Sequence, residues 1–129
     1  MSTRSFICVE DTVQGFRGIY CHYDGYPAHV GRILDGYYNS VTSALELIHG
    51  AQIRNFDQDG TIARFGVDAP DESEVYLSIE DALNSGYDYV YLFEYDCWKC
   101  FGRDSGIYHR IIREFDIPGR QHTSTKEAA

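Results

Sequence analysis

The stretch from Gly18 to Pro27 constrains the fold most, because its residues predict a strand, a turn and the start of a helix in immediate succession. Residues 19–23 alternate and are rich in aromatic and β-branched side chains, as is typical of a half-buried strand. Asp24-Gly25 predicts a turn, because Asp hydrogen-bonds its own backbone and Gly accepts a positive φ. Pro27 suits the first helical position, where its missing N–H costs nothing. We therefore expect the chain to bend from sheet to helix here.

This bend also carries the densest set of polar and reactive side chains in the sequence. Free N–H groups at the start of a helix favour anions, so the cluster is a candidate ligand corner. Its candidate binding residues are Tyr20, His22, Tyr23, Asp24 and Tyr26. The competing interpretation is structural: Asp24 caps the turn, and the Tyr and His side chains tie it together by hydrogen bonds.

Composition and charge narrow the classes of function. A chain of 129 residues, 43% of them hydrophobic, predicts one domain with a substantial core. The formal net charge of −9 repels phosphate backbones, so direct binding of duplex DNA is disfavoured, whereas a basic groove that normally holds nucleic acid would attract the chain. No apolar run is long enough to cross a membrane, and residues 1–5 lead into a strand without the apolar core of a signal peptide. We expect a cytosolic protein whose four cysteines are thiols.

Periodicity predicts strands and helices along most of the chain. Strands are expected at residues 6–10, 16–23, 53–56, 61–65, 75–77, 87–95 and 97–101, and helices at 27–38, 41–48, 79–85 and 107–115. The helix over 41–48 is the clearest, with Val41, Ala44, Leu45 and Ile48 on one apolar face. The fold class is α+β: an antiparallel sheet of about five or six strands with helices packed mainly on one face.

Residues 1–119 are expected to form the single domain, and the polar residues 120–129 a disordered tail. In the helix over 107–115, Arg110 and Arg113 would share one face, where they would grip a phosphate or an acidic partner, or pair with the chain's own carboxylates. The acidic stretch at residues 68–74 would either mimic nucleic-acid phosphates or form a solvated surface. Its candidate binding residues are Asp71, Glu72 and Glu74.

Two patterns invite a metal or catalytic interpretation. The sequence Cys-Trp-Lys-Cys at residues 97–100 has the spacing of half a zinc site, but a strand would send the two cysteines to opposite faces. His22, Asp24 and His29 would form a small acid–base cluster, yet the thiol of Cys21 would point away from His22. We expect no metal, no cofactor and no enzyme activity, with a small hydrolase centred on His22 and Asp24 as the least favoured alternative.

The segment at residues 18–27, followed by Val30-Gly31 and a helix ending at Tyr37-Tyr38, resembles the signature of a family of small uncharacterised proteins from phages and prophages. That signature is roughly I-Y-C-H-[WY]-D-G-Y-P-x-x-x-G-x-x-L. The opening at residues 3–7 is similar too, as is the run at 89–93 that leads to Trp98. The segment at residues 51–74 and the cysteine pair at 97 and 100 depart from the pattern.

The resemblance implies a phage origin and, with it, a small set of functions. Small phage accessory proteins without an enzyme signature often inhibit host defence by binding. The first hypothesis is therefore stoichiometric blocking of a host defence protein or nucleoprotein complex in the bacterial cytosol, as an anti-CRISPR protein does, through an acidic surface that mimics nucleic acid. The alternative is sequestration of a nucleotide second messenger, with the Tyr-rich corner supplying stacking and Arg110 and Arg113 the phosphate contacts. A homo-oligomer is compatible with either.

Overall fold

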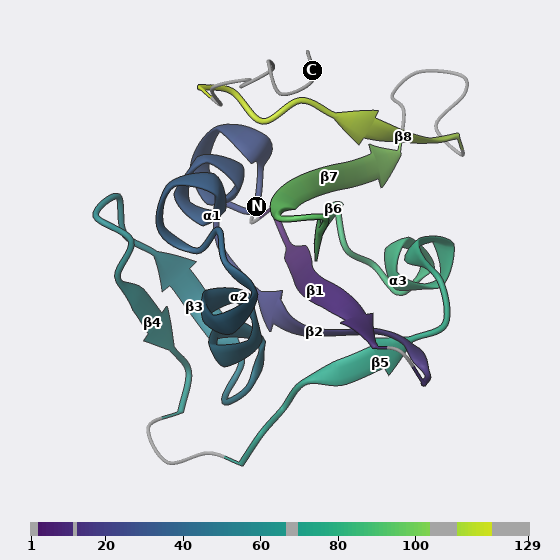
Figure 1. Cartoon of the computed structure of the whole chain (residues 1–129), viewed down its shortest axis with the longest axis horizontal. Helices are drawn as coiled ribbons and strands as arrows, with labels where there is room; N and C mark the ends of the chain where they lie inside the picture. The colour runs from purple at the N-terminus through teal and green to yellow at the C-terminus, as the bar shows by residue number, and fades with distance from the viewer. Residues whose placement is uncertain (1–2, 12, 67–69, 104–110, 120–129) are drawn as a thin grey trace.

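The chain forms one mixed sheet with helices on both of its faces (Figure 1). The computed structural model describes residues 3–11, 13–66, 70–103 and 111–119. The strands are β1 (Ser5–Asp11), β2 (Gly15–Cys21), β3 (Ile53–Phe56), β4 (Ile62–Arg64), β5 (Glu74–Tyr76), β6 (Tyr89–Glu94), β7 (Cys97–Arg103) and β8 (Ile112–Phe115). The helical elements are the π-helical turn η1 (Pro27–Gly31), α1 (Arg32–Tyr37), α2 (Val41–Ile48) and α3 (Ile79–Asn84).

The sheet differs from the expected antiparallel one in both size and direction. In the described ranges the sheet has eight strands: seven follow the order β4-β3-β2-β1-β6-β7-β8, and β5 lies off this path and pairs with β2. The pairs β1–β6 and β2–β3 are parallel. The cause is connectivity, because the chain passes through helices between β2 and β3 and again between β5 and β6, and such crossovers return a strand in the same direction. The expectation of five or six antiparallel strands is therefore wrong, while the mixture of sheet and helix is confirmed.

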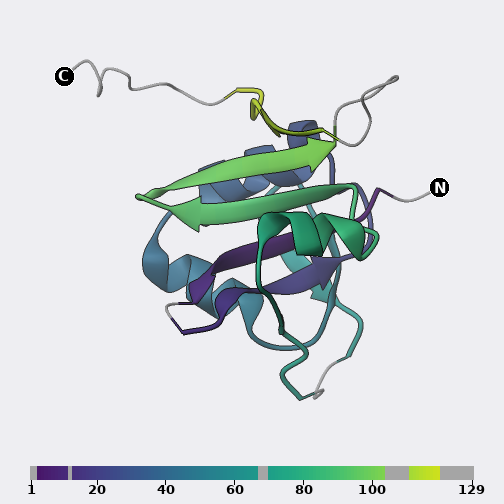
Figure 2. The same cartoon turned by 90° about the vertical axis from the view of Figure 1, so that its right-hand side faces the viewer.

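Two apolar layers hold the helices to the sheet. Tyr91, Phe93 and Trp98 face η1, α1 and α2 on one side, and Val90 and Leu92 face α3 on the other. Figure 2 shows α3 in front of the sheet with α1 and α2 behind it. The strand expected over residues 87–95 is thus present as β6, and both of its faces are buried, because β6 lies inside the sheet with helices on both sides.

Helix α2 begins with a capping box, in which the Ser40 side chain accepts from the Ser43 N–H while the Ser43 side chain accepts from the Ser40 N–H. Its buried residues are Ala44, Leu47 and Ile48. The expected apolar face is therefore only half covered, since Val41 and Leu45 remain 57% and 42% exposed.

The prediction of a helix over residues 107–115 is wrong for residues 111–115, the part that the structure describes. Residues Ile112–Phe115 form β8, which pairs antiparallel with β7, so backbone pairing at the sheet edge prevails over the helical spacing of the isoleucines. Arg110 and the tail at 120–129 lie outside the described residues. None of the helices in the described ranges is long and apolar enough to span a membrane.

Candidate binding site

The bend after β2 forms as expected and is fixed by backbone contacts. Asp24 takes the positive φ of the turn, at 56°, whereas Gly25 is needed for space. A Cβ on Gly25 would lie 2.7 Å from Ser5 Oγ and 2.9 Å from the carbonyl oxygen of Thr3. The buried hydroxyl of Tyr91 donates to the Gly25 carbonyl at 2.7 Å, which ties the bend to the centre of the sheet.

The side chains of this corner largely bond one another. The Tyr20 hydroxyl forms a short hydrogen bond with Nδ1 of His22, and the His22 ring contacts that of Tyr23 at 4.4 Å between centroids. Tyr26 lies on the other side of the bend, where its ring centroid is 6.1 Å from that of His29. The structure thus brings Tyr20, His22 and Tyr23 together and leaves Tyr26 apart from them.

The chemistry of this corner is limited by burial. Cys21 is fully buried, and burial raises the pKa of its thiol to about 12, so the reactive thiolate is scarce at neutral pH. Nδ1 of His22 bonds Tyr20 rather than Asp24, whose side chain is exposed. Within the described residues, no group of three His, Cys, Asp or Glu side chains is arranged to hold a metal ion. Cys97 and Cys100 lie on opposite faces of β7, as an extended strand requires.

The carboxylates of the acidic stretch accept hydrogen bonds from the chain itself. Asp71 accepts from the N–H groups of Gly50 and Ser73 and bonds Nδ1 of His49 at 2.8 Å. The Ser73 N–H and His49 hold the pKa of the Asp71 carboxyl well below its usual range. These bonds tie the loop to the end of α2, so Asp71 has a clear structural role.

The other two acidic candidates also have internal partners. Glu72 accepts from the Gln52 N–H at 2.8 Å, and Glu74 accepts from the Tyr76 hydroxyl at 2.9 Å. Arg113, expected on a helix, lies on β8 with its guanidinium 4.6 Å from the centroid of the Phe115 ring. Arg113 thus lies on the edge strand β8, whereas Glu74 lies on β5, which pairs with β2.

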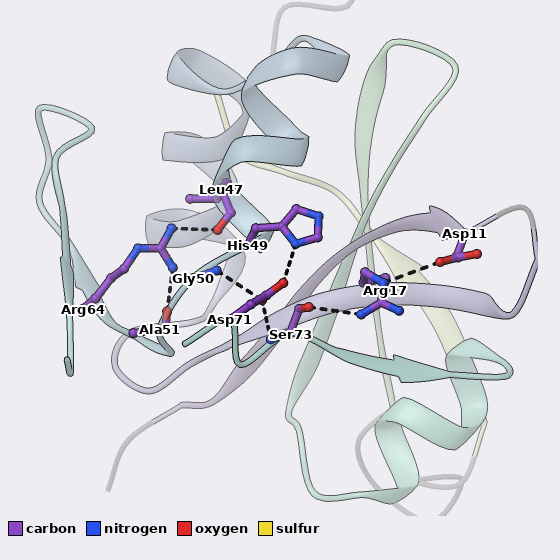
Figure 3. Close-up of polar contacts among 9 residues, drawn as sticks. All are labelled: Asp11, Arg17, Leu47, His49, Gly50, Ala51, Arg64, Asp71 and Ser73. Atoms are coloured by element: carbon purple, nitrogen blue, oxygen red, sulfur yellow. Dashed lines mark hydrogen bonds and ion pairs between the residues drawn. The ribbon is translucent and has the colours of Figure 1, made fainter. Parts of the chain in front are cut away.

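A polar network surrounds Asp71 at the end of α2 (Figure 3). Arg17 of β2 pairs with Asp11 at 3.5 Å and donates to Ser73 Oγ at 3.2 Å. Arg64 donates to the carbonyl oxygens of Leu47 and Ala51, and these hydrogen bonds cap the C-terminal end of α2. Asp11, Arg17 and His49 border a cavity of about 320 Å³ against Leu45 and Ile48.

This cavity adjoins a more apolar one farther along α2, and we call the two together the α2 groove. The apolar end measures about 430 Å³. Its apolar lining residues are Val9, Val41, Leu45, Phe93 and Tyr95. Val9, Glu10 and Leu45 line both cavities, so the two lie next to each other.

The border of the apolar end is acidic. Glu10, Glu94 and Asp96 line it, and the nearby cation Lys99 already pairs with Glu94 at 3.1 Å. In the part of the chain that the structure describes, neither Glu10 nor Asp96 forms an ion pair. The groove therefore combines exposed apolar surface with carboxylates whose charge is not neutralised locally.

A strained hairpin tip forms one wall of this end. Tyr95 and Asp96 are the two-residue connection between β6 and β7, and both have positive φ, at 53° and 61°. A type I′ turn requires this backbone, and Asn-Gly is its preferred sequence. Tyr95 is 86% exposed, so packing against the chain's own core does not explain a tyrosine in a left-handed conformation.

The groove is the site that sequence reasoning missed. The sequence predicts Val41 and Leu45 on the apolar face of the helix over 41–48, and Tyr95 at the end of the strand over 87–95. The available signal was the spacing of two residues between the alternating runs of β6 and β7, which identifies Tyr95 and Asp96 as a hairpin tip. Comparisons with protein family models, with curated proteins and with solved structures find no match for the chain.

Proposed function

We propose that this chain is a phage or prophage accessory protein that inhibits a host defence system by binding a protein partner mole for mole in the bacterial cytosol. The α2 groove carries the proposal. Its exposed apolar residues Val41, Leu45 and Tyr95 are rimmed by carboxylates, and such a patch on a small protein is typical of an interaction surface. The similarity of residues 18–27 to phage proteins supports the context.

The charge of the groove favours a basic partner. Among the residues that the structure describes, Glu10 and Asp96 form no ion pair, and the whole chain carries a formal charge of −9. Long-range attraction would speed association with a positively charged surface, such as the nucleic-acid groove of a CRISPR effector complex. The acidic mimicry first expected of Asp71, Glu72 and Glu74 is thereby assigned to Glu10 and Asp96 of the groove.

The strained tip supports a functional role for Tyr95. A tyrosine in the left-handed region costs about 1–2 kcal/mol relative to an ordinary conformation. Exposed tyrosines at the centre of an interface are frequent anchors, because a rigid ring buries much area at little entropic cost. Tyr95 is placed for that role beside the apolar floor of the groove.

The test is a titration of purified CRISPR effector complexes with the purified protein, with nuclease activity as the readout. We expect the nuclease activity of at least one complex to reach its minimum when one equivalent of the protein has been added, because each inhibitor molecule binds one target complex. Tyr95→Ser and Leu45→Ser should each weaken inhibition by about 30-fold, the effect of losing an interface anchor of about 2 kcal/mol. Phe65→Ser is the matched control, since Phe65 is 53% exposed but lies outside the groove. Inhibition that continues to grow with incubation time at substoichiometric ratios would contradict the proposal, as would a lack of effect on every complex.

A second candidate function is sequestration of a nucleotide signal. The exposed aromatic residues beside the bend, Tyr23 and Phe65, favour it.

A further inference from the structure

Four rings gather on the sheet face opposite α1 and α2, and we call them the aromatic face: Tyr20, His22, Tyr23 and Phe65. Tyr20 pairs with Phe6, whose ring belongs to the apolar layer under α3, so Tyr20 points to the same side. The side chain of Arg64 reaches α2 on one side of the sheet, so the next residue, Phe65, points to the opposite side. There the Phe65 ring contacts the ring of His22. Tyr23 and Phe65 are 41% and 53% exposed.

The rings hold one another in fixed positions. The His22 ring lies 4.4 Å from Tyr23 and 5.7 Å from Phe65, at interplanar angles of 75° and 72°. The hydrogen bond from Tyr20 fixes the His22 ring, and Tyr20 in turn contacts Tyr87, 5.9 Å away. Tyr23 and Phe65 flank the His22 ring and both are exposed, so each offers aromatic surface to a flat ligand.

Positive charge lies on this face in an otherwise acidic chain. Arg54 lies at the register shift of β3 between Ile53 and Asn55, and it is exposed, whereas its neighbour Ile53 is buried. The Tyr23 N–H donates to the Arg54 carbonyl at 3.0 Å, which places the two residues side by side. Arg4 is close enough to Tyr20 for its charge to act on the tyrosine hydroxyl.

We propose that the aromatic face binds a small nucleotide, stacking its base on Tyr23 and Phe65 and contacting its phosphate with Arg54 and Arg4. Planar aromatic rings beside arginines are the usual means by which proteins hold unpaired bases. The net charge of −9 repels a long polyanionic strand far more than a mononucleotide or dinucleotide, and this difference selects the small ligand. The site is independent of the α2 groove, and it replaces the phosphate contacts first expected from Arg110 and Arg113.

The experiment titrates the full chain with adenosine 5′-monophosphate, adenosine and ribose 5-phosphate, followed by amide and aromatic NMR shifts. We expect AMP to shift the resonances of Tyr23 and Phe65, and adenosine to bind at the same place but more weakly. Phe65→Leu, which removes the ring and keeps apolar volume, should weaken AMP binding by at least about fivefold. Arg54→Gln should weaken AMP but leave adenosine unchanged. Tyr95→Leu is the matched control, because it removes an exposed ring from the α2 groove and should leave AMP binding unaltered.

Three results would overturn the proposal. They are no shift with AMP up to about 10 mM, equal affinity for ribose 5-phosphate and AMP, and unchanged AMP affinity in Phe65→Leu together with Tyr23→Leu. The amide spectrum of each variant confirms that it is folded. Since Tyr95 and Phe65 serve different sites, loss of nucleotide binding and loss of protein binding can be told apart.

Discussion

Replacing Tyr95-Asp96 by Asn-Gly tests whether the hairpin tip is strained for the sake of binding. Both residues have positive φ, which costs an L-residue such as tyrosine about 1–2 kcal/mol. Asn and Gly accept this backbone with little penalty. The exchange also removes the contact between Lys99 and the Tyr95 ring, 5.5 Å away, which at an exposed site is worth about 0.5–1 kcal/mol. The net expectation is a stabilisation of about 1 kcal/mol.

That free energy translates into a measurable change in melting temperature. Unfolding entropy of about 2.1 cal/mol/K per residue gives roughly 0.27 kcal/mol/K for 129 residues, so Tm should rise by about 4 °C. Thermal unfolding followed by circular dichroism or calorimetry measures it. Leu77→Asn is the matched control, because Leu77 is 77% exposed and its φ is not in the left-handed region.

The same variant should lose partner binding while it gains stability. A Tm equal to or below that of the unaltered chain would refute the reasoning, because Tyr95 would then adopt its positive φ without a conformational cost. The argument that this tyrosine is retained for a partner would lose its basis.

Two further changes probe the bend and the acidic loop. Gly25→Ala should destabilise the fold by about 1–3 kcal/mol, because the new Cβ would clash with Ser5. Gly36→Ala should instead stabilise α1 by about 0.5–1 kcal/mol, because no atom of the described residues lies within 4 Å of the new Cβ. Urea unfolding measures both free energies, and equal effects would contradict the close approach at Gly25. Asp71→Asn should lower stability at pH 7 by no more than about 1 kcal/mol, since the pair with His49 is half exposed. The folded-state pKa of Asp71 is lowered, so its contribution is present above the ordinary value of about 3.9 and is lost as the pH falls through the lower folded value. The difference between the two proteins should therefore shrink towards pH 2, and a constant difference from pH 7 to about pH 2 would exclude the mechanism.

Local sequence signals predicted the elements well where one residue type decides the backbone. Pro27 begins η1, as expected, and a serine, Ser40, caps α2. Strand direction was not predictable in this way, because alternation along β6 is the same whether its neighbour runs parallel or antiparallel. Only the path of the chain through α3 makes β6 parallel to β1.

Burial was predicted less well than structure type, and this is why the candidate site was missed. The spacing of Val41 and Leu45 indicates a helix face, but coverage of that face depends on which strands end beneath it. At the other end of the chain, the spacing of isoleucines suited a helix, yet Ile112–Phe115 pairs with β7. Hydrogen bonds to Asp71 come from residues far away in sequence, although the Ser73 N–H bond is a local Asx turn that the pattern Asp-x-Ser could have indicated.

The position of β1 has a consequence for how the molecule forms. One neighbour, β2, follows within a few residues, whereas the other, β6, begins at Tyr89. The hairpin of β1 and β2 therefore keeps the outer edge of β1 unpaired until the chain has been synthesised through residue 94. Long-range pairing of this kind slows folding, and until β6 pairs, the free edge of β1 is prone to aggregate with other chains. We expect any fragment that stops before β6 to aggregate rather than to settle into a smaller native core.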